Sequence, residues 1–235
     1  MDNKNIISKR QTNHLSKEMV KILRHSAEKM KIHIDTDGYI NLADLVLNLK
    51  TIKNIDIKGN QTEILQTIHL IVKDCKKQRF SIRKIKSDKK LNYLNILSKF
   101  EIRANQGHSM KIVNISDFEF IKYPEIEIPT LFHGTFKKYV NSIMKYGLNR
   151  MKRNNIHLTE GFIGNKNSQG KNIISGIRNN CQIIILIDTK KASEKYDLKF
   201  FRSSNGVILC PGNANGSIPP DCLSVVEIKD VRRKS

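Results

Sequence analysis

The segment Arg103-Ala104-Asn105-Gln106-Gly107-His108-Ser109 groups a cation with amide, imidazole and hydroxyl side chains around one glycine, directly after a strand-like run, Phe100–Ile102. A guanidinium offers a planar fork of hydrogen-bond donors, and a glycine lets the backbone approach a ligand closely. Buried polar groups must all find partners, so this composition suits a core poorly. From its residues alone, the 103–109 segment is either a phosphate-facing loop or a polar turn that closes a hairpin.

Three further cations have settings that fit anion binding. Arg24-His25 falls near the end of a predicted helix, where a solvated helix C-terminus favoured by the helix dipole is the alternative interpretation. Lys77 and Arg79 begin a predicted strand at positions i and i+2, so both side chains would share one face and could bind one anion. The lysines that follow, Lys84, Lys86, Lys89 and Lys90, fit a solvated charged face.

Four polar motifs in the second half of the sequence lie at predicted strand ends or turns. They are His133-Gly134-Thr135, Arg153 to Leu158, Ser175-Gly176-Ile177-Arg178, and Ser203 to Val207. Strand ends beside helix starts often bind nucleotides through backbone N–H groups and short polar side chains. A satisfied turn histidine is the alternative for His133. None of these motifs supplies a carboxylate suited to be a general base.

The composition points to a polyanionic partner. The 235 residues include 42 Lys and Arg against 22 Asp and Glu, a formal charge of +20, which favours nucleic acid as the partner. A lysine-rich surface without a function is the alternative. The four cysteines show no metal or redox spacing, so no metal is expected. The start of the sequence lacks a signal-type apolar core, and we expect a soluble intracellular protein of the cytoplasm or nucleus.

The predicted elements that must position these residues begin with an amphipathic helix over Leu15–Met30, after a polar, flexible start (residues 1–14). A turn at Asp37-Gly38 leads to a short strand, Tyr39–Ile40, and Asn41 caps a helix that runs to about Leu49. A helix over 61–75 and strands over 79–85 and 100–104 follow. Helix, strand, two helices and a two-stranded wing is the order of a winged-helix domain, a common nucleic-acid platform that does not by itself define function.

A proline-bracketed break at Tyr123–Pro129 separates this half from a second one. There the pattern predicts a helix over 137–146 that ends at Gly147, and strands over 130–133, 156–158, 181–188, 207–210 and 223–228. The 160–172 stretch is a loop by composition. We therefore expect an α+β chain of two lobes, residues 15–123 and 130–230, with a cleft between them.

Taken together, these motifs resemble those of the NAD-dependent RNA 2′-phosphotransferases, which remove a splice-junction 2′-phosphate from tRNA. The resemblance covers roughly residues 15–225. The matching motifs are, in order, Leu23-Arg24-His25, Asp37-Gly38-Tyr39, Lys77-Gln78-Arg79-Phe80, the 103–109 segment, His133-Gly134-Thr135, Arg153 to Leu158, Ser175 to Arg178 and Asn205 to Leu209. The 103–109 segment, when it is followed later in the chain by His133-Gly134-Thr135, is highly specific to this family.

The resemblance implies an N-terminal winged-helix lobe that binds RNA and a C-terminal lobe related to ADP-ribosyltransferase toxins. It implies that NAD⁺ is consumed and that the RNA 2′-phosphate passes through an ADP-ribosylated intermediate. The products would be 2′-OH RNA, nicotinamide and ADP-ribose 1″,2″-cyclic phosphate. The expected partners are RNA with a 2′-phosphate, in particular tRNA, and NAD⁺; we expect a monomer and no membrane contact.

The resemblance also assigns roles to residues. The catalytic cations would be Arg24, Lys77, Arg79 and Arg153. We expect the first three to hold the 2′-phosphate and Arg153 to bridge toward NAD. The RNA contacts would be His25, Arg103, Gln106, His108 and Ser109. The NAD contacts would be His133, Gly134, Thr135, His157, Ser175, Arg178, Asn205, Gly206 and Val207. His157 and Val207 stand where the toxins have Tyr and Glu. The family usually has a histidine where this chain has Asn155, and the loops at 51–60 and 160–172 are long for the family.

Two other functions fit parts of this pattern. One is an ADP-ribosyltransferase that modifies terminal phosphates of nucleic acid and stops after the first step. The other is a winged-helix RNA-binding protein without catalytic activity, for which the basic composition would suffice.

Overall fold

The computed structural model describes residues 8–53, 55–85, 95–114, 116, 118–122, 130–178 and 180–228. Over these residues the protein is of the mixed α+β class, as the sequence predicts. The chain divides into two compact units, residues 1–116 and 117–235. The predicted break at 123–129 lies outside the described residues.

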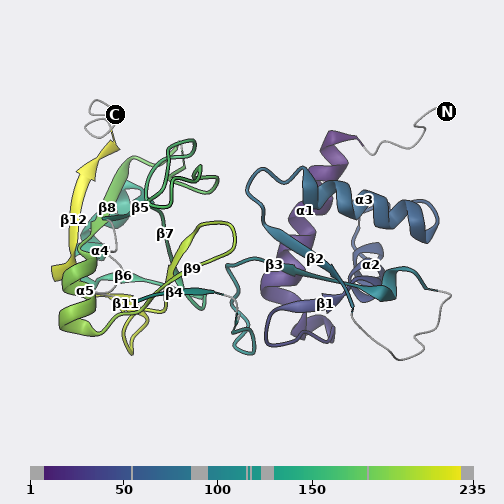
Figure 1. Ribbon diagram of the computed structural model, residues 1–235, viewed down its shortest axis with the longest axis horizontal. Helices are drawn as coiled ribbons and strands as arrows, with labels where there is room; N and C mark the ends of the chain where they lie inside the picture. Colours follow the sequence, from purple (N-terminus) through teal and green to yellow (C-terminus); the bar gives the residue numbers. More distant parts are fainter. Residues whose placement is uncertain are drawn as a thin grey trace. The chain divides into compact units, whose positions relative to one another are not determined.

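Unit 1 contains a three-stranded antiparallel sheet and three α-helices (Figure 1). The strands are β1 (Tyr39–Asn41), β2 (Phe80–Lys84) and β3 (Phe100–Ala104), in the order β1-β3-β2. The helices are α1 (Lys9–Lys21), α2 (Leu42–Lys50) and α3 (Gln61–Lys73). The predictions for α2, α3 and the strands are confirmed, and Asn41 caps α2 by accepting a hydrogen bond from the N–H of Ala43.

The first helix differs from its prediction at both ends. It begins at Lys9, earlier than the predicted Leu15, because Ser8 and Gln11 form a reciprocal capping box. The α-helix then ends at Lys21 and is followed by a π-helical turn, Ile22–Ser26, and a 3₁₀ turn, Glu28–Met30. The predicted apolar face is buried from Leu15 to Ala27, whereas Met30 is partly exposed. It packs into a unit 1 core that includes Met19, Ile22, Leu23, Leu42, Leu45, Leu49, Ile68 and Ile102.

Unit 2 contains three small sheets. The first has the order β4-β9-β10-β7, the second β12-β8-β5 and the third β11-β6. Their strands are β4 (Glu119–Ile121), β5 (Leu131–Thr135), β6 (Leu148–Asn149), β7 (Ile156–Leu158), β8 (Ile183–Ile187), β9 (Phe200–Arg202), β10 (Ile208–Cys210), β11 (Ser217–Ile218) and β12 (Leu223–Glu227). All the pairings between these strands are antiparallel.

The apolar run Ile183–Ile187 forms β8, the middle strand between β12 and β5. Its side chains alternate between two apolar clusters, with Ile183, Ile185 and Ile187 in one and Ile184 in the other. A strand covered on both faces reads as a continuous apolar run rather than an alternating one.

Two helices pack on this framework. Helix α4 (Lys137–Tyr146) is confirmed as predicted, and Gly147 ends it with a φ of +89°. Helix α5 (Thr189–Tyr196) was not predicted. No helix in the described part of the chain is long and apolar enough to cross a membrane.

Candidate functional site

Arg24 and His25 lie in the π-helical turn that follows α1. Single π-helical turns are frequent at functional sites. The N–H of Ser109 donates to the carbonyl oxygen of Arg24 at 2.9 Å, and the Ser109 hydroxyl lies 3.0 Å from Nδ1 of His25. Gly107 lies against the Arg24 side chain, because a Cβ placed there would stand 3.1 Å from Cζ of Arg24. The 103–109 segment thus holds the turn that carries Arg24.

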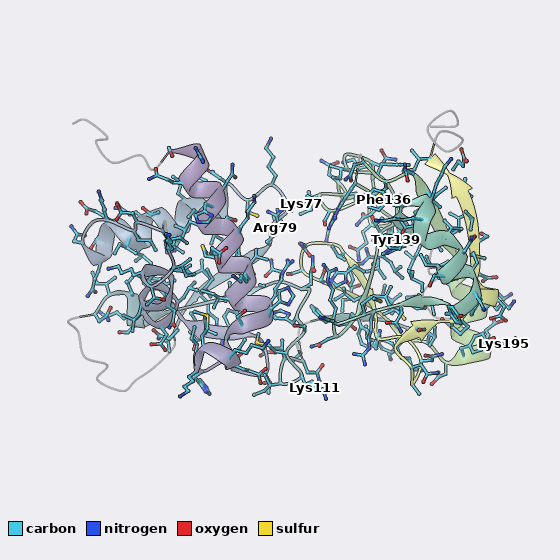
Figure 2. The ribbon with its side chains drawn as sticks, turned by 180° about the vertical axis from the view of Figure 1, so that it is seen from behind. Lys77, Arg79, Lys111, Phe136, Tyr139 and Lys195 are labelled. Atoms are coloured by element: carbon cyan, nitrogen blue, oxygen red, sulfur yellow. The ribbon has the colours of Figure 1, made fainter. Side chains whose placement is uncertain are left out.

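Lys77 lies in the tight turn Cys75–Gln78, and Arg79 follows this turn directly before β2; both side chains are labelled in Figure 2. The observed strand β2 begins at Phe80, after both cations, so the strand geometry that was expected to align Lys77 and Arg79 does not apply to them. The turn has its own restraints: Gln78 has a φ of +43°, and its N–H donates to the carbonyl oxygen of Cys75 at 2.7 Å. The backbone N–H and Nη1 of Arg79 donate to Sγ of Cys75 at 3.4 and 3.5 Å.

The 103–109 segment is buried, contrary to the expectation that its composition suits a core poorly. Arg103, Asn105, Gln106 and His108 are at most 8% exposed. Their burial is possible because backbone groups serve as partners: Arg103 donates to the carbonyl oxygen of Asp37, and Asn105 donates to that of Gln78. The guanidinium of Arg103 also lies 4.7 Å from the ring centroid of Tyr39. The 103–109 segment therefore holds neighbouring parts of unit 1 together, in addition to being a candidate binding loop.

His108, in the same 103–109 segment, is an uncharged imidazole at neutral pH. Burial, together with the charges of Arg24, Arg103 and His25, lowers the pKa of His108 to about 3. Its Nε2 is buried and has no hydrogen-bond partner among the described residues. A Cβ on Gly38 would stand 3.1 Å from this nitrogen. The imidazole therefore fills its space beside two cations without adding a third charge.

In unit 2, His133 and His157 lie on the neighbouring strands β5 and β7. Nδ1–H of His133 donates to the carbonyl oxygen of His157 at 3.0 Å, and Nη1 of Arg153 lies 3.4 Å from Nδ1 of His157. Burial and the charges of Arg153 and Arg178 lower the pKa of His133. Desolvation and Arg178 lower the pKa of Arg153. Two arginines therefore lie within electrostatic range of one another beside a neutral histidine, an arrangement that an anion would stabilise.

Gly134 and Thr135 complete β5, and Gly134 packs against the segment that carries Ser175 and Arg178. A Cβ on Gly134 would stand 2.9 Å from Cγ2 of Ile177 and 3.0 Å from Sγ of Cys181. The N–H of Ile177 also donates to the carbonyl oxygen of Gly161 at 3.4 Å. The strand end at 133–135 and the 175–178 turn are thus brought together.

The remaining predicted contacts form a turn between β9 and β10. Ser203 binds the Val207 backbone through both its N–H and its hydroxyl, and the hydroxyl lies 2.9 Å from Oδ1 of Asn205. Asn205 and Val207 are buried, whereas Gly206 has a φ of +77° and no atom within 4 Å of a Cβ placed there. This turn leaves Gly206 open to a close approach by a ligand.

The carboxylate next to these motifs, Glu160, is already bound. Arg202 Nη1 and the N–H of Ser168 donate to it, and its side chain is 4% exposed. Burial raises the pKa of Glu160, but the hydrogen bonds from Ser168 and Arg202 outweigh this effect and lower the pKa overall. No group of three metal-binding side chains occurs in the described part of the chain.

The predicted residues therefore fall into two sets. Arg24, His25, Lys77, Arg79, Arg103, Gln106, His108 and Ser109 belong to unit 1, and the others belong to unit 2. The sequence interpretation missed the contribution of Asn105 and Cys75, although both stand within or beside quoted motifs. It also missed Arg150, whose Nη1 donates to the carbonyl oxygens of Arg153 and Asn154 at 3.3 Å and so braces the Arg153 turn.

Comparison with known proteins gives a consistent result. A tRNA 2′-phosphotransferase of Saccharomyces cerevisiae is 34% identical over 218 residues, 92% of this chain and 83% of that protein. The tRNA 2′-phosphotransferase 1 of Danio rerio is 32% identical over 206 residues, 88% of this chain and 81% of that protein. A Schizosaccharomyces pombe protein named "Putative tRNA 2'-phosphotransferase" is 37% identical over 217 residues, which are 92% of this chain. This chain spans about half of the length of that protein, 52%.

The family described as "RNA 2'-phosphotransferase, Tpt1 / KptA family" matches residues 9–212. That range includes every motif described above, in both units. The chain belongs to the RNA 2′-phosphotransferase, Tpt1 / KptA family.

Proposed function

We propose that this protein is an NAD-dependent RNA 2′-phosphotransferase that removes an internal 2′-phosphate from RNA. Family membership and the names of the relatives support the reaction class and point to tRNA as the substrate. The formal charge of +20 suits a polyanionic substrate. The products would be 2′-OH RNA, nicotinamide and ADP-ribose 1″,2″-cyclic phosphate.

The observation that carries the NAD proposal is the cluster in which His133 bonds to the His157 carbonyl oxygen and Arg153 lies 3.4 Å from the His157 ring, with Arg178 close enough to lower the pKa of both His133 and Arg153. A pair of guanidinium groups suits a diphosphate, and a neutral imidazole adds a donor or an acceptor without further repulsion. The residues that would hold NAD are His133, Gly134, Thr135, His157, Ser175, Arg178, Asn205, Gly206 and Val207. NAD, when bound, supplies the ribosyl carbon that accepts the phosphate and the nicotinamide that leaves.

The cations of unit 1 would hold the RNA 2′-phosphate. Arg24, Lys77 and Arg79 neutralise and orient this dianion, and Arg153 of unit 2 lies with the groups assigned to NAD. Because the attacking phosphate is already an anion, no general base is required. Glu160 is committed to Arg202 and Ser168, and Val207 is apolar. The work of the protein is thus positioning and charge stabilisation, for which removal of one donor typically costs about 3 kcal/mol.

We also infer the fold family of each unit. Unit 1 would be a winged-helix lobe that binds RNA, supported by its order of one helix, one strand, two helices and two strands. Unit 2 would be an ADP-ribosyltransferase-like lobe that binds NAD, supported by its three small antiparallel sheets.

The test is an assay of an oligonucleotide with one internal 2′-phosphate in the presence and absence of NAD. The wild type should release nicotinamide and form 2′-OH RNA in equal amounts, and only with NAD. Arg79→Ala should slow the reaction about 100-fold, the equivalent of one lost donor. Lys84→Ala, which removes an exposed cation from the same wing, should change the rate less than about twofold.

Other outcomes would redirect the proposal. Equal rates in wild type and Arg79→Ala would contradict the role given to Arg79. Accumulation of ADP-ribosylated RNA without the cyclic phosphate would favour a transferase that stops after the first step. RNA binding without any affinity for NAD in calorimetry would favour a non-catalytic RNA-binding protein.

A further inference from the structure

Asn105 makes three hydrogen bonds to the short stretch 78–81. Its Nδ2 donates to the carbonyl oxygen of Gln78 at 2.7 Å, and its Oδ1 accepts from the Ser81 hydroxyl at 2.6 Å. Its backbone N–H donates to the carbonyl oxygen of Arg79 at 2.8 Å. The side chain is buried, with the residue only 4% exposed. A buried amide that is satisfied in this way fixes the conformation of its partners.

The segment that Asn105 holds needs such support. Gln78 adopts a φ of +43°, a region that residues with a Cβ seldom occupy. The conformation of Gln78 decides the direction in which the backbone leaves Lys77 and enters Arg79. Besides the Asn105 bonds, this segment is held by the Gln78 N–H bond to the Cys75 carbonyl, by two weak bonds from Arg79 to the Cys75 sulfur, and by the pairing of Phe80 with Ala104 where β2 begins.

The same loop also holds Arg24. Two residues after Asn105, Gly107 contacts the Arg24 guanidinium, and Ser109 binds both the Arg24 carbonyl oxygen and the His25 ring. The segments that carry Arg24 and Lys77–Arg79 are far apart in the sequence, yet residues 105–109 bond to both. Residues 105–109 therefore bond to both segments that carry the three cations assigned to the 2′-phosphate, Arg24, Lys77 and Arg79.

We propose that Asn105 is a positioning residue, whose side-chain amide aligns Lys77 and Arg79 with Arg24 so that the three bind one phosphate. The inference rests on the proposed function only in naming the 2′-phosphate of RNA as that anion. Asn105 itself does not contact the substrate. Its role is specific to an amide: alanine removes both side-chain bonds, whereas aspartate keeps the acceptor for Ser81, loses the donor to Gln78 and adds an anion at a buried position.

Asn41 offers a matched control in the same unit. Its Nδ2 donates to the Ser98 carbonyl oxygen at 3.0 Å and its Oδ1 accepts from the Ala43 N–H at 2.9 Å. Asn41 thus bridges two backbone segments as Asn105 does. In the sheet, Asn41 of β1 is paired with Glu101 near the start of β3, whereas Asn105 follows the other end of β3. The two asparagines therefore lie at opposite ends of this strand. Asn41→Ala should destabilise the protein without moving the cations.

The experiment compares full-length wild type, Asn105→Ala, Asn105→Asp and Asn41→Ala by three measurements. The first is amide hydrogen exchange of the peptide that covers 75–81. The second is the ratio of Kd values for an oligonucleotide without and with one internal 2′-phosphate. The third is kcat/KM for that phosphorylated RNA, together with KM for NAD. Melting temperatures show how far each variant is destabilised.

Both Asn105 variants should exchange the 75–81 amides at least tenfold faster and lose at least tenfold in the Kd ratio and in kcat/KM. Their KM for NAD should stay within twofold of the wild type. Asn41→Ala should lower the melting temperature but leave the other values within twofold. The inference is overturned if Asn105→Ala leaves 75–81 exchange and the Kd ratio unchanged, or if Asn41→Ala changes them equally. Absence of NAD-dependent phosphate loss in the wild type would refute the proposed function alone, because the exchange measurement and the Kd ratio do not depend on turnover.

Discussion

Gly107 lies directly against the guanidinium of Arg24. A Cβ at Gly107 would stand 3.1 Å from Cζ and 3.2 Å from both Nε and Nη1 of Arg24. Gly107 also has a φ of +91°, so two separate constraints favour glycine at this position. One is the backbone conformation and the other is the space taken by a cation that we assign to phosphate binding.

The effect of Gly107→Ala should therefore exceed that of backbone strain alone. The backbone should cost about 1–2 kcal/mol of stability. The methyl group should in addition displace Arg24 and lower kcat/KM for 2′-phosphorylated RNA at least tenfold. Steady-state kinetics and denaturant unfolding measure the two effects separately.

Gly164→Ala is the control for this variant. Gly164 has a φ of +96° but no atom within 4 Å of a Cβ placed there. It should show a comparable loss of stability from strain with a change in kcat/KM of less than twofold. Equal kinetic losses in the two variants would mean that the Gly107 contact with Arg24 has no functional role.

The fold could be predicted from the sequence wherever local signals decide it. Asn41 before an apolar helix and Gly147 after one marked two helix ends correctly. The Ser8 and Gln11 capping box and the Asp188 cap of α5 are signals of the same kind that were overlooked. By contrast, the pairing of β4 with β9 joins residues far apart in the sequence, and no local pattern predicts it.

The sequence motifs name candidate site residues, but they do not give the geometry of those residues. The motifs indicated Arg24, Lys77 and Arg79, yet nothing local shows that Asn105 bonds to Gln78 and Ser81 across the sheet. Burial of the 103–109 segment was also unpredictable, because its partners are backbone groups of other segments. The sequence shows that these side chains are polar, but it does not show that carbonyl oxygens of distant segments lie next to them and allow their burial.

The stability of the protein should depend on pH through His108. Its pKa is about 3 when folded, against the ordinary value of 6.5. Below pH 6.5 the unfolded chain takes up a proton at this position that the folded protein does not, so stability falls as the pH decreases from about 6.5 toward 3. Between pH 7 and pH 5 this one group should account for a loss of up to about 2 kcal/mol.

His108→Gln isolates this contribution, because glutamine does not titrate. Urea unfolding at pH 7 and pH 5 should show a smaller pH-dependent loss in the variant than in the wild type. The other titrating groups are the same in both proteins and cancel in the difference. Identical pH dependence would show that folded His108 titrates near its ordinary pKa.

Gly134→Ala should weaken NAD binding. A methyl group at Gly134 would stand 2.9 Å from Ile177 and 3.0 Å from the Cys181 sulfur, so the segment that carries Arg178 must move away from His133. We expect the Kd for NAD to increase at least tenfold in calorimetry. Gly170→Ala is the control, since no atom lies within 4 Å of a Cβ placed there, and it should change the Kd less than twofold. If the NAD affinity of Gly134→Ala is unchanged, the 175–178 turn does not contribute to NAD binding.

Removal of one partner of the buried pair Arg202–Glu160 should destabilise unit 2 strongly. The two side chains are 9% and 4% exposed, so Arg202→Met leaves a buried carboxylate without its cation and should cost about 3 kcal/mol. Lys199→Met breaks a pair whose side chains are 51% and 84% exposed and should cost less than about 1 kcal/mol. The double variant Glu160→Gln with Arg202→Met should recover part of the loss, because it removes the stranded charge. Urea unfolding followed by circular dichroism measures all three, and equal losses for Arg202→Met and Lys199→Met would contradict a buried charge pair.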